Sequence, residues 1–98
     1  MKQSSFEAIA DEIIVSVRSA EGLSNSQLKR LLSILHEELK CWTALDAIPK
    51  SKVYALIILR DNIIGARNYY KKDDETMNNL CKAESEIDLF MEAALVGA

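Results

Sequence analysis

Apolar residues recur at intervals of three and four positions in the first part of the chain. They are Phe6, Ile9, Ala10, Ile13, Ile14 and Val17. This spacing places them on one face of an α-helix. Ser4 and Glu7 have the spacing of a capping box, in which each side chain accepts the other residue's backbone N–H, and Gly22 suits a helix end. The pattern therefore predicts a helix over about residues 5–21.

The next stretch predicts a longer helix over about residues 25–47. Its apolar face consists of Leu28, Leu31, Leu32, Leu35, Leu39 and Trp42. Ser24 and Gln27 form a second capping box. Pro49 ends the helix, because the residue before a proline is pushed out of helical geometry.

Two further apolar seams complete the pattern. They predict helices over about residues 51–71 and 74–96. The first seam consists of Leu56, Leu59, Ile63, Ala66 and Tyr70, and the second of Met77, Leu80, Ala83, Ile87, Phe90, Met91 and Ala94. Because the connections are only a few residues long, we expect an all-α fold, an up-down four-helix bundle in one domain (1–98) with a shorter first helix.

The third predicted helix carries more apolar residues than one seam needs. Val53, Ile57 and Ile64 are expected to widen the seam. Three more apolar side chains lie well away from it: Tyr54, Ile58 and Tyr69. On the fourth helix, the residues opposite the seam are Leu89, Ala93 and Val96. Since a helix that is apolar nearly all round is normally buried all round, we expect these two patches to contact another protein chain.

Charged residues also interrupt the apolar arcs of these two helices. Arg60 and Arg67 lie one heptad apart inside the arc of the third helix, and Glu84 lies inside that of the fourth. The arginine heads reach water along the surface, or they form buried ion pairs with acids such as Glu84. Asp88 and Glu92 continue the acidic row, which is either a solvated edge or a ridge for a basic partner.

Composition and charge narrow the class of protein. With 98 residues, 49% apolar and 28% charged, the chain has enough apolar residues for a core and a net charge of −3. Residues 73–98 sum to −6 and residues 23–72 to +5, so we expect an acidic last helix to pack on basic middle helices. No apolar run is long enough to cross a membrane, and the acidic amino terminus does not resemble a signal peptide. The expected location is the cytoplasm.

Residues suited to chemistry gather in the second helix but point apart. His36 and Cys41 lie roughly 140° apart around the helix axis. Trp42 belongs to the core face, and Cys41 is expected in a second apolar row of the same helix. Cys41 and Cys81 lack the paired spacing of a zinc site. Histidine phosphotransfer domains place lysine and glycine three and four residues after their histidine, whereas Leu39 and Lys40 stand there in this chain. We therefore expect no enzyme activity, no metal and no cofactor.

Binding is the function class that remains. Immunity proteins of the colicin nuclease type are similar in size and acidity, but their adjacent tyrosines precede a proline, whereas Tyr69-Tyr70 precede two lysines. Nucleic acid is not expected as a partner, because RNYYKK is the only basic stretch with aromatics and acids follow it directly. We expect a non-catalytic inhibitor or regulator that docks a face of the third and fourth helices on a larger macromolecule. The alternatives are a structural homodimer, and phosphoryl transfer through His36.

Overall fold

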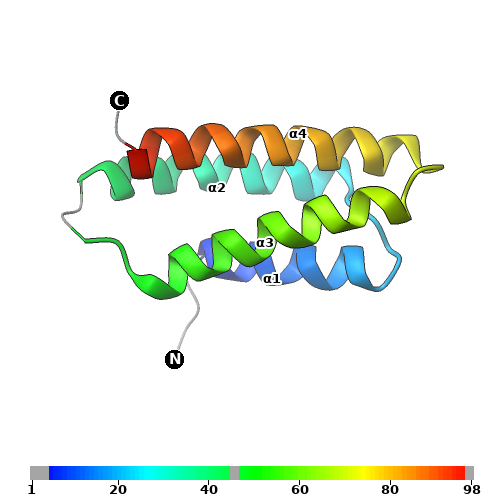
Figure 1. Cartoon of the computed structure of the whole chain (residues 1–98), viewed down its shortest axis with the longest axis horizontal. Coiled ribbons are helices and arrows are strands. Elements are labelled where there is room, and N and C mark those ends of the chain that lie inside the picture. The colour runs from blue at the N-terminus through cyan, green and yellow to red at the C-terminus, as the bar shows by residue number, and fades with distance from the viewer. Residues whose placement is uncertain (1–4, 45–46, 97–98) are drawn as a thin grey trace.

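The chain folds into four α-helices joined by short connections. The computed structural model describes residues 5–44 and 47–96. The helices are α1 (Ser5–Arg18), α2 (Asn25–Ala44), α3 (Lys50–Tyr69) and α4 (Asp74–Met91), and a short π-helix η1 (Glu92–Val96) continues α4 (Figure 1). The prediction of an all-α four-helix bundle with a shorter first helix is confirmed, since α1 has 14 residues. Within the described ranges, each helix is too short or too polar to span a bilayer.

The helices form two antiparallel pairs, α1 with α2 and α3 with α4, and the α3/α4 pair lies in front in Figure 1. Helix α1 packs on α2 and α3, and α4 packs on α2 and α3. In the described residues the backbones of α2 and α3, which follow each other in sequence, make no close contact, and neither do those of α1 and α4. Both of these pairs therefore lie on diagonals. The chain direction alternates as an up-down bundle requires, but α1 runs parallel to its neighbour α3, and α2 parallel to α4. The α1/α3 edge and the α2/α4 edge are consequently on opposite sides of the molecule.

The core is built from the predicted seams of all four helices. Its fully buried large side chains are Phe6, Ile9, Ile13, Leu23, Leu31, Trp42, Leu56, Leu59, Ile63, Leu80 and Ile87. Trp42 joins three helices, because its ring meets Phe6 edge-on at 6.3 Å and Phe90 edge-on at 4.9 Å between centroids. Trp42 lies in the core as predicted from its helix face.

The capping box predicted at the start of α2 is present, and α4 has a capping residue that was not predicted. Gln27 N–H donates to Ser24 Oγ (3.1 Å) and Ser24 N–H donates to Gln27 Oε1 (2.9 Å), which completes the capping box of α2. At α4, Asp73 accepts from the N–H of Thr76 (3.0 Å). Ser4, which was predicted to cap α1, lies outside the described residues. So do residues 45–46, and α2 is described only to Ala44.

The α1–α2 connection is joined to the end of α3 and the start of α4 by buried hydrogen bonds. Gly22 N–H donates to the hydroxyl oxygen of Tyr70 (3.1 Å), and this hydroxyl donates to the carbonyl of Val17 (2.8 Å). Leu23 N–H donates to Thr76 Oγ1 (3.2 Å), and Asn79 Nδ2 donates to the carbonyl of Leu23 (2.9 Å). These side chains satisfy loop backbone groups that are withdrawn from water and would otherwise be unpaired. These hydrogen bonds therefore form a buried polar network with a structural role at this end of the bundle.

Candidate protein-binding surfaces

Exposed apolar side chains concentrate on α3. Seven large apolar side chains are exposed among the described residues, and four of them belong to α3: Tyr54, Ile57, Ile64 and Tyr69. Tyr54 and Tyr69 are the most exposed of these, at 67% and 70%. Ile58 is half-buried. The packing of the four helices therefore leaves a large apolar part of α3 facing water.

Five residues form a straight row along the outside of α3, which we name the outer stripe: Tyr54, Ile58, Asp61, Gly65 and Tyr69. Their spacing of three and four positions places them on one side of the helix. The outer stripe borders α1 through two grooves. One, of about 210 Å³, is lined in part by Tyr54, Ile58 and Ile14 of α1. The other, of about 470 Å³, is lined in part by Gly65, Tyr69 and Arg18 of α1.

The second predicted patch lies in a groove between α2 and α4, which we name the α2/α4 groove. Its volume is about 430 Å³, and its lining is Leu32, Leu35, His36, Leu39, Glu86, Leu89, Phe90 and Ala93. Leu89 is 60% exposed and Ala93 is half-buried. The side chain of Val96, which was predicted to join this patch, lies outside the described residues. The groove is an apolar concavity with a histidine and a glutamate in its lining.

The two patches do not share one face of the molecule. Tyr54, Ile58 and Tyr69 lie on the α1/α3 edge, whereas Leu89 and Ala93 lie on the α2/α4 edge. Because these edges are on opposite sides of the bundle, a single face of α3 and α4 cannot contain both patches. The helical wheel of each helix distinguishes its core face from its outer face, but it carries no information on which helices are neighbours.

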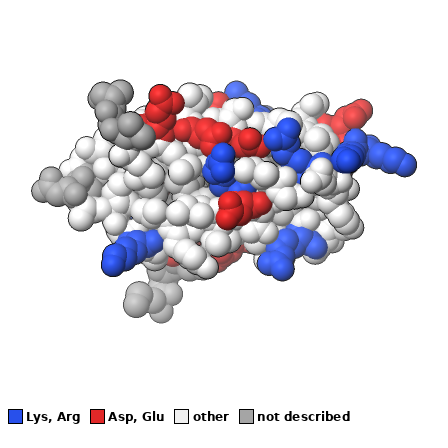
Figure 2. Space-filling view, in the orientation of Figure 1, with Lys and Arg blue, Asp and Glu red and all other residues white. Residues whose placement is uncertain are grey.

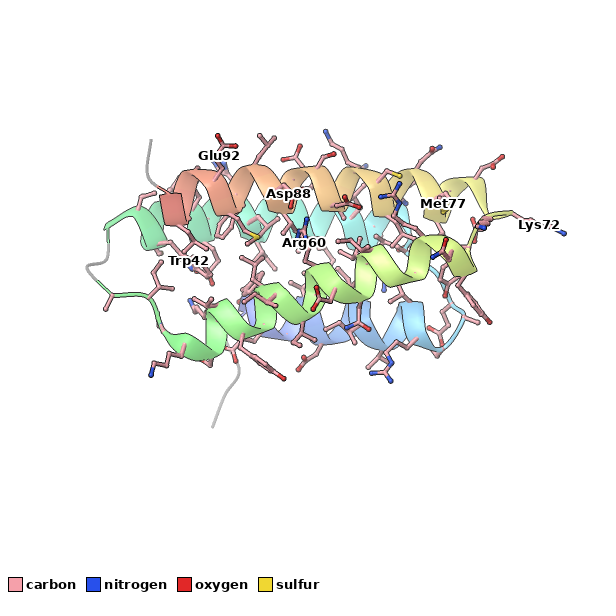
Figure 3. The ribbon with its side chains drawn as sticks, in the orientation of Figure 1. Trp42, Arg60, Lys72, Met77, Asp88 and Glu92 are labelled. Atoms are coloured by element: carbon pink, nitrogen blue, oxygen red, sulfur yellow. The ribbon has the colours of Figure 1, made fainter. Side chains whose placement is uncertain are left out.

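The face shared by α3 and α4 holds ion pairs instead. Arg60 Nε lies 2.7 Å from Asp88 Oδ1, and Arg67 Nη1 lies 2.7 Å from Glu84 Oε1. Figure 3 shows Arg60 reaching from α3 towards Asp88 on α4. The hydrogen bond and the charge of Asp88 raise the pKa of Arg60 above its ordinary value. Both pairs lie at the surface rather than buried in the core, because each retains partly exposed charged groups.

The positions of these arginines explain why two isoleucines that were predicted to be buried are exposed. Ile57 and Ile64 were predicted to widen the core seam, yet they are exposed at 44% and 37%. Arg60 and Arg67 lie between them and the core rows of α3, so their stems occupy the position next to α4. Figure 2 shows the acidic row along α4, with basic side chains directly beside and below it. The partner of Glu84 and Asp88 in this row is α3 of the same chain.

A buried ion pair at the other end of the bundle was missed in the sequence. Glu38 is buried, and its carboxylate accepts from Trp42 Nε1 (3.2 Å) and from Lys52 Nζ (2.9 and 3.0 Å). Lys52 belongs to the first turn of α3, so this pair joins the diagonal helices α2 and α3. The only signal in the sequence was the i, i+4 spacing of Glu38 and Trp42, which does not reveal burial. The hydrogen-bond donors to Glu38 are side chains of α2 and α3 in the same chain, so we assign Glu38 a structural role.

The residues suited to chemistry remain apart in the structure. His36, Cys41 and Cys81 are all exposed. Cys41 was predicted to join a second apolar row of α2, but it faces water. Among the described residues, no three histidine, cysteine, aspartate or glutamate side chains gather closely enough to hold a metal ion.

Comparison of the chain with protein-family models, with curated proteins and with solved structures returned no match. Function is therefore inferred from the residues and geometry of this chain alone.

Proposed function

We propose that this chain is a small, non-catalytic protein-binding module that regulates a larger protein by docking on it through the α2/α4 groove. The observation that carries the proposal is the composition of the groove. Six of its eight lining residues are apolar, and they come from two helices. Leu89, at its rim, is 60% exposed, although the core is complete without it.

A concave apolar groove between two helices suits one kind of ligand above others. An amphipathic helix inserts side chains spaced at i, i+3, i+4 and i+7 into such a groove, and it buries apolar area on both partners. The α2 wall offers Leu32, Leu35 and Leu39, which follow the groove at the same helical spacing. We therefore expect the docking segment of the partner to be an amphipathic helix.

Trp42 provides a direct report of binding, because it is the only tryptophan of the chain. Its ring contacts Phe90, which lines the groove. A designed amphipathic helical peptide of leucine, alanine and glutamine is the probe. Titration with this peptide should change the emission of Trp42 in a saturable way, because an occupant of the groove repacks Phe90.

Two lysine variants make the test specific. Leu89→Lys places a charge at the rim of the groove and should weaken peptide binding about tenfold or more, the effect of roughly 1.4 kcal/mol. Val15→Lys is the control, since Val15 is similarly exposed at 66% but lies on α1 outside the groove. Each lysine has an acidic residue three positions before it, Glu86 for Leu89→Lys and Glu12 for Val15→Lys. Equal peptide affinity for the two variants would contradict docking in the groove.

A further inference from the structure

The outer stripe of α3 reads nearly the same in both directions. Along the helix it runs tyrosine, isoleucine, a polar pair, glycine and tyrosine, at Tyr54, Ile58, Asp61-Asn62, Gly65 and Tyr69. When two copies of one helix pack antiparallel about a two-fold axis, residue i faces a residue whose number is a constant minus i. With an axis between Asp61 and Asn62, Tyr54 meets Tyr69 and Ile58 meets Gly65, while Asp61 meets Asn62, which borders the stripe.

We propose that two copies of this chain associate through the outer stripe, with their α3 helices antiparallel about a two-fold axis between Asp61 and Asn62. This register brings Tyr54 of one copy against Tyr69 of the other at both ends of the interface. Tyrosine supplies large contact area at low entropic cost and is enriched among interface residues that dominate affinity. Both tyrosines are largely exposed in the isolated chain.

Side-chain size is complementary in the same register. Ile58 of one copy faces Gly65 of the other, so a large side chain meets a residue that has none. A Cβ built on Gly65 meets no atom within 4 Å, so the space above this glycine is open. Glycine in a helix interior destabilises the helix relative to alanine. The isolated bundle offers no packing reason for glycine here, whereas an approaching isoleucine does.

Charge is complementary at the two-fold axis. Arg18 of α1 and Asp61 line the same groove, but neither forms a salt bridge with another described residue of its own chain. Beside the axis, Arg18 of each copy approaches Asp61 of the other, which gives two symmetric ion pairs. Asn62 Nδ2 donates one hydrogen to the carbonyl of Ile58 (2.8 Å), which leaves its second hydrogen for Asp61 of the second copy.

This association leaves the α2/α4 groove open. The α1/α3 edge is covered in the dimer, and the opposite edge of each copy faces outward. The dimer thus presents two grooves on its two outer sides. Self-association and docking of a partner use different surfaces, so either proposal can be wrong without affecting the other.

The first test is the mass of the wild type beside two leucine variants, one on α3 and one on α4, by sedimentation equilibrium. The wild type should have twice the mass of the 11.0 kDa chain. Gly65→Leu fills the place of the incoming Ile58 and should raise the dissociation constant of the dimer about tenfold or more. Ser85→Leu is the control, because Ser85 is exposed on α4, outside the α1/α3 edge. It should leave the dimer unchanged.

Loss of the dimer in Gly65→Leu would not be due to loss of folding. Gly65 has no neighbour to clash with, and leucine favours helix, so Gly65→Leu should unfold at the same or a higher temperature than the wild type. A wild type of 11.0 kDa at high protein concentration would overturn the proposal. So would a Gly65→Leu variant that dimerises as tightly as the wild type.

Disulfide cross-linking tests the register in a background where serine replaces Cys41 and Cys81, which are exposed. A mixture of Tyr54→Cys chains and Tyr69→Cys chains should form a disulfide-linked heterodimer. Neither variant alone should cross-link, because like positions lie about 22 Å apart along an antiparallel pair. Cross-linking of Tyr54→Cys to itself would show a parallel arrangement and would overturn the proposal.

Discussion

At the scale of single residues, Tyr69 and Tyr70 show how neighbours in sequence take different roles. Tyr70 is buried, and its hydroxyl links Gly22 N–H to the carbonyl of Val17. Tyr69 is exposed, and its ring packs edge-on against Tyr70 at 5.0 Å. The sequence assigns Tyr70 to the core seam correctly. The role of its hydroxyl was not predictable, because it depends on a loop 48 positions away.

Removal of one hydroxyl at a time should separate these roles. Tyr70→Phe leaves a buried N–H and a buried carbonyl without partners, and should lower the free energy of unfolding by about 1–3 kcal/mol. Tyr69→Phe should change it by less than about 0.5 kcal/mol, as expected for a surface position. Urea denaturation followed by circular dichroism measures both. Equal losses in the two variants would refute a specific role for the Tyr70 hydroxyl.

Gly22 makes a similar point about what a sequence reveals. Gly22 was predicted to end the first helix, but α1 ends at Arg18, and Ala20, with a φ of +65°, is the first left-handed residue after it. The structure adds a second constraint, since a Cβ at this position would collide with Thr76 Oγ1 of α4. The φ of +83° suits glycine in the connection between α1 and α2, but only the packed structure shows that α4 approaches it.

At the scale of helices, the pair between Glu38 and Lys52 links two elements that do not otherwise touch closely. Lys52 crosses from the start of α3 to a buried carboxylate on α2. A carboxylate withdrawn from water is costly unless it is paired and hydrogen-bonded. The pair therefore holds the diagonal helices in register at the end away from the loop network.

Breaking this pair from one side should be more harmful than replacing both charges. Lys52→Met leaves Glu38 buried without its cation and should lower the free energy of unfolding by about 1–3 kcal/mol. Lys50→Met is the control on the same helix turn, because Lys50 is exposed. Glu38→Gln/Lys52→Met retains an acceptor for Trp42 Nε1 and should recover most of the loss. Thermal denaturation of the three variants measures these differences, and a double variant no more stable than Lys52→Met would contradict the assignment.

At the scale of the whole molecule, the arrangement of helices decides which residues share a surface. Hydrophobic periodicity predicted the helices and their core faces, because each helix buries one side. Periodicity gives no ring order, so Tyr54 and Leu89 were assigned to one face although they lie on opposite edges. The charge distribution was more informative. The expected attraction between an acidic last helix and a basic middle helix takes the form of the Arg60–Asp88 and Arg67–Glu84 pairs.

Docking on a larger protein is the central claim, and affinity capture from cells that naturally produce the chain tests it most directly. Wild type, Leu89→Lys and Val15→Lys serve as baits at equal concentration, and each captured protein is purified and titrated back by calorimetry. The account predicts a protein that binds the wild type and Val15→Lys with one site per chain, and that binds Leu89→Lys at least about tenfold more weakly. A partner that binds all three baits with equal affinity would contradict docking through the α2/α4 groove.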